Sequence, residues 1–310
     1  MEIEGGETYP AGNRLKKRQI REWFALISGR GSLVFVNALA FVILCGLLLK
    51  ALPILQMVSL SDLLFSSSWY PMKNEFGMFP FLISTLAVTG LAMAMAVPVC
   101  LLCAIYLSEY AGRRFREASR LVIDILAGIP SVIYGLCGVL VIVPFVARLG
   151  EMAGISTTGY SLLAGGLVLA VMVTPFIISI SVEVLRMIPD PVRETAFALG
   201  TTRWETVKYV VLKKAGRGLL AAIVMGFARA FGETMAVLMV VGNVAQVPSS
   251  VFDPAYPLPA LIANNYGEVM SIPLYDAALM SAALMLMLVV AAFSFTAHYA
   301  LLKIGETQDR

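Results

Sequence analysis

The sequence predicts an all-α polytopic membrane protein with about six transmembrane helices, and three observations support this fold class. Hydrophobic residues make up 59% of the chain and charged residues only 14%, well below the roughly 25% of an ordinary soluble domain. Several apolar runs exceed the ~18 to 20 residues that a helix needs to cross the hydrocarbon core. The spacing of these runs leaves little sequence for a soluble domain. Backbone amides in lipid must be hydrogen-bonded within their own segment, so we expect the runs to be helices.

Six apolar segments are long enough to span the bilayer, at residues 32–55, 78–107, 121–147, 160–182, 218–241 and 275–301. They predict a transmembrane domain over 32–301, between a basic tail at 1–31 and a short tail at 302–310. With both tails inside the cell, cytoplasmic segments hold 19 of the 23 Lys and Arg residues, so the positive-inside rule predicts cytoplasmic termini. No small-residue cleavage site closes the first apolar segment, so we expect no removable signal peptide.

Two loops are expected on the outer side, at 56–77 and 242–274. The first carries Trp69 and Tyr70, which are typical of the headgroup level of a bilayer. The second carries five prolines, which prevent a long helix. A surface for an external partner and a structured cap over the helices both fit this second loop.

The third expected span, 121–147, contains a proline and several small residues. Pro130 removes one backbone hydrogen bond and favours a kink, while Ser131 and nearby glycines allow close approach of another helix. A flexible gate and a packing seam are both compatible with Pro130 and Ser131. Asp124 lies near the cytoplasmic end of this span, where we expect a hydrated anchoring role.

The longest expected cytoplasmic connection, 183–217, is too polar to span the membrane and is rich in helix-forming residues. Two prolines stop the preceding helix, and Asp190 before Pro191 favours the start of a new one. We expect a short helix from there to Leu199, ending at Gly200, because glycine permits a left-handed turn.

This connection resembles the coupling loop of ABC importer permeases. Glu194, Ala196 and Gly200 stand at positions of that loop's pattern, whereas Thr195 replaces an alanine and Lys213 replaces a proline. The resemblance implies a helix that docks into a groove on an ATP-hydrolysing subunit. The alternative is an amphipathic turn that rests on the membrane. No phosphate-binding loop of the Walker type occurs in the sequence, so we expect ATP and Mg to be used by a separate ATPase and no cofactor to be bound here.

Residues 127–135 (AGIPSVIYG) and 229–237 (RAFGETMAV) are similar to segments of the phosphate importer permeases, PstC type. The resemblance extends over nearly all of the chain beyond the tail. It implies a type I ABC importer permease (MetI-like) fold in the bacterial inner membrane. It also implies a homologous PstA-like permease subunit, two copies of a PstB-like ATPase and a periplasmic PstS-like phosphate-binding protein as partners.

Arg229 lies about midway along the fifth expected span, and Glu233 follows four residues later. A charged side chain near the bilayer centre costs at least about 2.5 to 3.5 kcal/mol, so the two residues need compensation or a function. Their spacing predicts one shared helix face. They either form a self-contained ion pair or line, with Thr234, a translocation path in which Arg229 binds phosphate oxygens.

The resulting hypothesis is the permease subunit of an ATP-driven phosphate importer. The alternatives are a type I permease for another oxyanion such as phosphonate or molybdate, the PstA-type subunit, a stand-alone ion channel and an intramembrane enzyme. No paired aspartates, His-rich cluster or nucleophile with a base occurs among the expected spans, so no catalytic or metal-binding residue is predicted. We interpret His298 as a structural residue, and likewise the four cysteines, Cys45, Cys100, Cys103 and Cys137.

Overall fold

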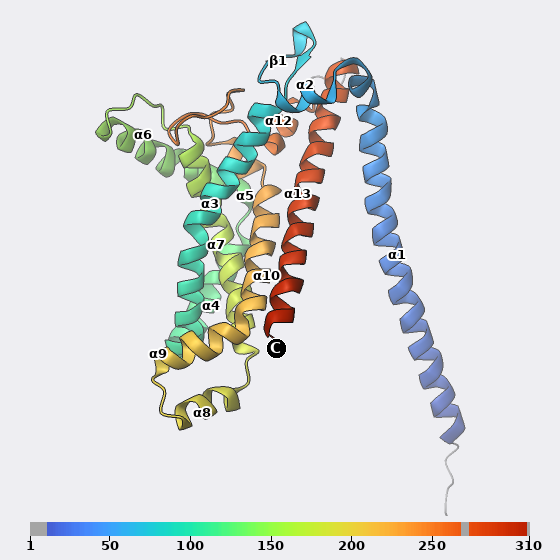
Figure 1. Ribbon diagram of the computed structural model, residues 1–310, viewed down its shortest axis with the longest axis vertical. Helices are drawn as coiled ribbons and strands as arrows, with labels where there is room; N and C mark the ends of the chain where they lie inside the picture. The colour runs from blue at the N-terminus through green and yellow to red at the C-terminus, as the bar shows by residue number, and fades with distance from the viewer. Residues whose placement is uncertain (1–10, 268–272, 309–310) are drawn as a thin grey trace, which may run out of the picture. The chain divides into compact units, whose positions relative to one another are not determined.

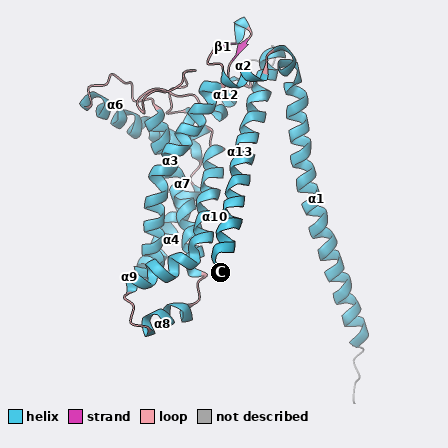
Figure 2. Ribbon diagram, in the orientation of Figure 1, coloured by secondary structure: helices cyan, strands magenta, loops and turns pink. Residues whose placement is uncertain are grey.

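The computed structural model describes residues 11–267 and 273–308, and most of these residues are helical (Figure 2). The chain divides into two compact units, residues 1–50 and 51–310, which are considered separately. The described part of the first unit belongs to α1 (Ala11–Met57), a helix whose segment Leu26–Met57 is long and apolar enough to span a membrane. Its Leu33, Phe35 and Val42 side chains are mostly exposed, as expected where lipid is the solvent.

The second unit is built around helices that lie side by side: α3 (Phe79–Ile105), α7 (Leu162–Arg186), α10 (Leu212–Phe231) and α13 (Pro273–Gln308) (Figure 1). A π-helical turn, η2 (Tyr106–Tyr110), continues α3. The core between α3 and α7 is apolar, with Met93, Val173 and Ile177 almost fully buried. At Gly226 of α10 a Cβ atom would lie 2.7 Å from the Ile177 side chain, so the glycine lets α10 pack closely on α7.

The short elements of the loop between α1 and α3 gather at one end of the bundle. They are α2 (Leu60–Phe65), β1 (Trp69–Tyr70), η1 (Pro71–Lys73) and β2 (Glu75–Phe76). The two strands pair antiparallel, with Trp69 opposite Phe76. The Trp69 ring packs edge-on against Phe81, with ring centroids 5.0 Å apart. Helix α12 (Leu258–Asn265), from the second predicted outside loop, lies at the same end (Figure 1).

The prediction of one span over 121–147 is wrong in its bounds, because this segment forms two helices that are separated at Pro130, the residue at which a kink was expected. Helix α4 (Arg113–Gly128) ends before Pro130, and α5 (Ser131–Cys137) begins after it. Ile129 is extended, with ψ 129°, as expected for a residue that precedes proline. The π-helical η3 (Gly138–Ile142) and α6 (Val143–Met152) continue α5. The segment long and apolar enough to span is therefore Ser131–Met152.

The fifth predicted span, 218–241, is wrong in its bounds, and this segment is not among the five helices of the described residues that are long and apolar enough to span a membrane. Its helix begins earlier, because α9 (Arg203–Glu205), the π-helical η4 (Thr206–Val211) and α10 follow one another directly. It also ends earlier, at Phe231, and the short α11 (Met235–Leu238) follows after a break at residues 232–234. The spans predicted at 78–107, 160–182 and 275–301 correspond to α3, α7 and α13, which are confirmed as apolar helices of spanning length.

Candidate functional site

The helix predicted in the 183–217 connection is present as α8 (Asp190–Ala198). Gly200 follows it in the left-handed region, with φ 82°, as its sequence position predicts. Helix α8 lies beyond the ends of the bundle helices, at the end opposite to β1 and α12 (Figure 1). The two predicted outside loops and the predicted inside helix thus occupy opposite ends of the molecule.

The motif residues of α8 divide into a buried and an exposed set. Ala196 is buried, whereas Glu194 and Thr195 are exposed, and the Thr195 hydroxyl donates to the Pro191 carbonyl at 2.7 Å. Next to them, Leu199 is 80% exposed and Phe197 is also exposed. Apolar side chains gathered on a polar end of a protein are typical of a contact surface for another protein.

A buried ion pair joins α8 to the end of α3. The Arg193 guanidinium donates to the two carboxylate oxygens of Glu109, at 2.8 and 3.2 Å, and these side chains are only 15% and 9% exposed. Arg193 also donates to the carbonyls of Leu185 and Ile188 at the end of α7. The hydrogen bonds that Arg193 donates to Glu109 raise the pKa of Arg193. Helix α8 is therefore attached to both α7 and the α3 extension.

Two further contacts fix the chain on the other side of α8. The Arg203 guanidinium lies 5.0 Å from the centre of the Tyr110 ring, next to Glu109. Thr202 and Glu205 form a capping box that starts the following helix, and the Thr202 hydroxyl and backbone N–H lower the pKa of Glu205. The chain on both sides of α8 is thus attached to the bundle, through Arg193 before α8 ends and through Arg203 after it.

Sequence reasoning missed the roles of Arg193 and Glu109. The two residues lie 84 positions apart, so no local motif links them. The one available signal was Arg193 itself, a basic residue beside Glu194 in the segment that carries the coupling pattern.

Arg229 lies in the last turn of α10, with an exposed side chain. Its guanidinium stacks 5.0 Å from the centre of the Phe176 ring of α7, and it is near enough to Tyr134 of α5 to act on it electrostatically. The Arg229 guanidinium forms no hydrogen bond or ion pair with any residue in 11–267 or 273–308. An arginine without such a partner in a helix bundle is free to bind an anion.

Glu233 does not pair with Arg229, so the prediction that the two residues share one helix face is wrong. Helix α10 ends at Phe231, and Glu233 lies in the break that follows. Its Oε1 accepts a hydrogen bond from the Ala236 backbone N–H at 3.1 Å, which caps the start of α11. The Thr234 hydroxyl donates to the Gly232 carbonyl at 3.3 Å. Both side chains thus stabilise the break rather than a continuous helix.

The two segments that carry the phosphate-permease resemblance meet in space. Helix α5 packs against α11, and a Cβ atom on Gly135 would lie 3.1 Å from the Ala236 Cα. A close contact between α5 and α11 therefore lies at Gly135, and Pro130 and Ser131 stand at the break before α5. Tyr134 bridges that break, since its hydroxyl donates to the Leu126 carbonyl at 2.8 Å. The breaks in the two helices thus lie in the two segments that pack together.

Comparison with known families and proteins gives consistent results. Residues 96–303 match the family model described as binding-protein-dependent transport system inner membrane component. The probable ABC transporter permease protein YqgH of Bacillus subtilis is 42% identical over 213 residues, which cover 68% of each chain. The phosphate transport system permease protein PstC of Xylella fastidiosa is 33% identical over 320 residues, which cover 96% of each chain.

Solved structures of ABC transporters have a similar fold. A bacterial alginate ABC transporter matches with a TM-score of 0.62 and 15% identity, over 92% of this chain and 96% of that one. The MetNI methionine ABC transporter, in an inward-facing conformation, matches with a TM-score of 0.56 and 21% identity, over 71% of this chain and 93% of that one. At these identities the likeness concerns the fold alone.

Proposed function

The chain belongs to the family of binding-protein-dependent transport system inner membrane components, and from that premise we propose that it is the PstC-like permease subunit of an ATP-driven importer of inorganic phosphate. The match to PstC proteins over nearly the whole chain supports phosphate as the substrate. The unpartnered Arg229 is the single structural observation that carries the proposal. A planar guanidinium that has no protein carboxylate to bind suits the oxygens of phosphate.

In this proposal, Arg229 receives phosphate between the interrupted helices. Its side chain is held over Phe176 by cation–π attraction, which positions the guanidinium without neutralising its charge. Glu233 and Thr234 line the path and maintain the break after α10 through their backbone contacts. Pro130 keeps α4 and α5 as separate segments, so that they are able to tilt independently as a gate.

Helix α8 is proposed to transmit the motion of the ATPase. Its exposed Glu194, Thr195, Phe197 and Leu199 offer a polar and apolar contact surface, while Ala196 and Gly200 shape the helix and its end. The Arg193–Glu109 pair carries movement of α8 to α3. Two PstB-like ATPase subunits bind and hydrolyse ATP with Mg, a PstA-like permease completes the pathway, and a PstS-like protein delivers phosphate from outside.

The position of α8 also supports an orientation. The predicted outside loops lie at one end of the bundle and α8 at the other (Figure 1). With α8 facing the cytoplasm, the protein lies in the bacterial inner membrane with cytoplasmic termini. Residues 1–10 and 309–310 of the two tails lie outside the described residues.

The test is ATP-dependent phosphate uptake by the complete assembly in proteoliposomes, with wild type and Arg229→Gln compared. Loss of a charged hydrogen-bond donor to phosphate is expected to lower uptake roughly tenfold to a hundredfold. ATP hydrolysis should persist, because α8 is unchanged. Arg113→Gln is the matched control, since Arg113 is 91% exposed and lies far from α10 in the sequence. Undiminished uptake by Arg229→Gln would refute the role of Arg229, and uptake of molybdate or phosphonate in place of phosphate would refute the substrate.

A further inference from the structure

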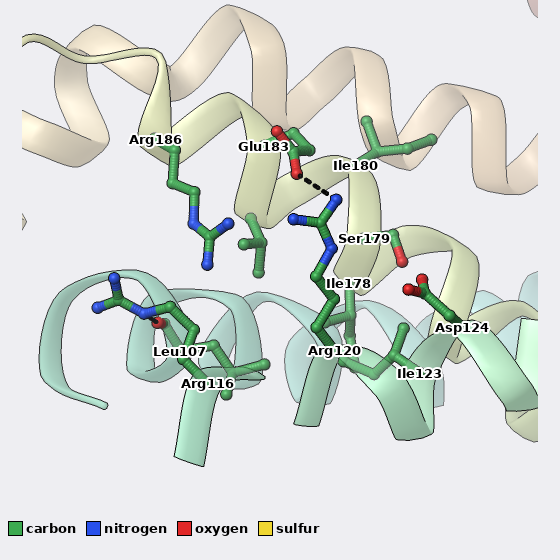
Figure 3. A pocket seen from close by; sticks show the side chains of 11 residues that line it. Leu107, Arg116, Arg120, Ile123, Asp124, Ile178, Ser179, Ile180, Glu183 and Arg186 are labelled. Atoms are coloured by element: carbon green, nitrogen blue, oxygen red, sulfur yellow. Dashed lines mark hydrogen bonds and ion pairs between the residues drawn. The ribbon is translucent and has the colours of Figure 1, made fainter. Parts of the chain in front are cut away.

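A second set of arginines lies at the end of the bundle that carries α8. A pocket of about 280 Å³ opens between α4 and the C-terminal part of α7. Figure 3 shows Arg116 and Arg120 reaching it from α4, and Arg186 from the end of α7. The carboxylates of Asp124 and Glu183 also line it. This pocket is separate from Arg229, which does not line it.

The three guanidinium groups of the pocket differ in what they bind. Arg116 donates from Nε and Nη2 to the carbonyls of Leu107, Ser108 and Ala111 at 2.8 to 3.1 Å and so caps the end of the α3 extension. Arg120 makes a loose contact with Glu183 at 3.6 Å, with both side chains more than half exposed. An ion pair of this kind contributes little and is easily exchanged.

Arg186 has no partner among the residues that the structure describes. Its Nε is shielded from solvent and forms no hydrogen bond, although leaving a buried charged donor unbonded is costly. Figure 3 shows its guanidinium directed into the pocket, on the side where Arg116 also lies. Two cations that face one space without an intervening carboxylate favour the binding of an anion between them.

The net charge of the residues that line the pocket indicates how many negative charges the anion carries. Three arginines and two carboxylates line it, so one formal positive charge is left without a counter-charge. A phosphodiester carries one negative charge and accepts the bidentate hydrogen bonds that arginine offers. Free inorganic phosphate presents the same oxygens but carries a larger charge near neutral pH, which Asp124 and Glu183 would oppose.

An apolar groove adjoins the pocket. It has a volume of about 470 Å³ and lies between α4 and the end of α3, where Tyr106 and Phe115 line it. The groove and the pocket share Leu107, Ile123 and Ile178. A charged pocket that continues into an apolar groove beside membrane-spanning helices matches a molecule with a phosphate at one end and a hydrocarbon chain at the other.

We propose that the pocket and the groove together bind an anionic phospholipid, with its phosphate between Arg186 and Arg116 and one acyl chain along the α3–α4 groove. This site is independent of phosphate transport through Arg229. The phosphodiester would supply the hydrogen-bond acceptor that Arg186 lacks. It would also hold α4 against the end of α7, just before α8 begins.

The test is native mass spectrometry of the purified full assembly, exchanged into mild detergent with phosphatidylglycerol or phosphatidylcholine. Wild type is expected to retain phosphatidylglycerol in preference to phosphatidylcholine. Arg186→Gln is expected to lower retention of phosphatidylglycerol about tenfold, since it removes a charged, bidentate donor. The mostly exposed Arg120→Gln gives a second measurement if Arg186→Gln does not assemble, with a smaller loss expected. Arg113→Gln, on the same helix but outside the pocket, should retain the lipid as wild type does.

A parallel arm offers inorganic phosphate alone to delipidated protein and measures binding of the radiolabelled ion. Displacement of bound phosphatidylglycerol only by other anionic lipids would support the proposal. Phosphate binding that depends on Arg186, without lipid retention, would overturn the lipid assignment and indicate a free-phosphate site. Equal retention of both lipids by wild type, or equal retention of phosphatidylglycerol by Arg113→Gln and Arg186→Gln, would also overturn it.

Discussion

Arg193 and Arg229 show how one residue type serves two purposes in this protein. The Arg193 guanidinium is mostly buried and donates hydrogen bonds to Glu109 and to backbone carbonyls, whereas the Arg229 guanidinium is exposed and stacks on the Phe176 ring. A satisfied arginine holds two elements together, because removing it strands a buried carboxylate. An arginine whose guanidinium has no carboxylate or carbonyl partner is able to bind an anion. In the proposed function, this contrast distinguishes the residues that transmit motion from the residue that binds phosphate.

The largest effect is expected from Arg193→Ala, which leaves Glu109 buried and unpaired. Breaking one side of a buried pair typically costs about 3 to 5 kcal/mol, so α8 should detach from α3. We expect faster amide hydrogen exchange over residues 190–198 and loss of ATP-driven uptake in the same variant. Unchanged exchange in α8 would contradict the mechanical role of Arg193.

Gly135→Ala should have the next largest effect, because the added Cβ would lie 2.7 Å from the Met239 Sδ and 3.1 Å from the Ala236 Cα. Overpacking of this kind typically costs about 1 to 3 kcal/mol. The change pushes α5 away from α11, so thermal stability and uptake should both fall. Gly90→Ala is the matched control, since no atom lies within 4 Å of its added Cβ. Equal behaviour of the two variants would place the seam elsewhere.

Arg229→Lys tests whether the Arg229 guanidinium binds phosphate. Lysine keeps the positive charge but loses the planar fork and much of the stacking on Phe176, so phosphate uptake is expected to fall about tenfold, near 1.4 kcal/mol. The thermal stability of the assembly should change little, because the Arg229 guanidinium forms no hydrogen bond or ion pair with a described residue and its stacking on Phe176 is exposed. A clear drop in stability would show that Arg229 acts structurally, as Arg193 does.

The smallest effect is expected from Arg113→Ala. Arg113 pairs with Glu117 at 2.9 Å, but the two side chains are 91% and 65% exposed, and such surface pairs typically contribute about 0 to 1 kcal/mol. Thermal unfolding and uptake should match wild type. A loss of thermal stability or uptake as large as that of Arg193→Ala would mean that burial does not determine how much these ion pairs contribute to stability.

The fold class and the family resemblance followed from the sequence because they rest on long apolar runs and on local patterns. Helices α3, α7 and α13 are regular apolar segments. Helix α8 begins at a proline and ends at a glycine, and both signals can be recognised in the local sequence. Hydropathy is insensitive to where a helix breaks. It gave one span across Pro130, and it missed the break at residues 232–234, where no proline marks the end of α10.

The candidate site was predictable in its residues but not in its geometry. Arg229, Glu233 and Thr234 stood out as polar groups in an apolar segment, yet their relation depended on the break that separates Glu233 from α10. The Arg193–Glu109 pair and the Arg186 pocket join residues from distant parts of the chain. Such contacts are set by packing between helices, which a single sequence does not encode in any local pattern.

The central claim, that α8 transmits the work of a separate ATPase, is tested most directly by a cross-link at its exposed end. Leu199→Cys in the assembled transporter, cross-linked to an engineered cysteine on the ATPase subunit, is compared with wild type, whose four cysteines lie at Cys45, Cys100, Cys103 and Cys137. The account predicts that the cross-link forms only in Leu199→Cys and abolishes ATP-dependent phosphate uptake until it is reduced. Full uptake by the cross-linked assembly, or labelling of Leu199→Cys from outside intact cells, would contradict it.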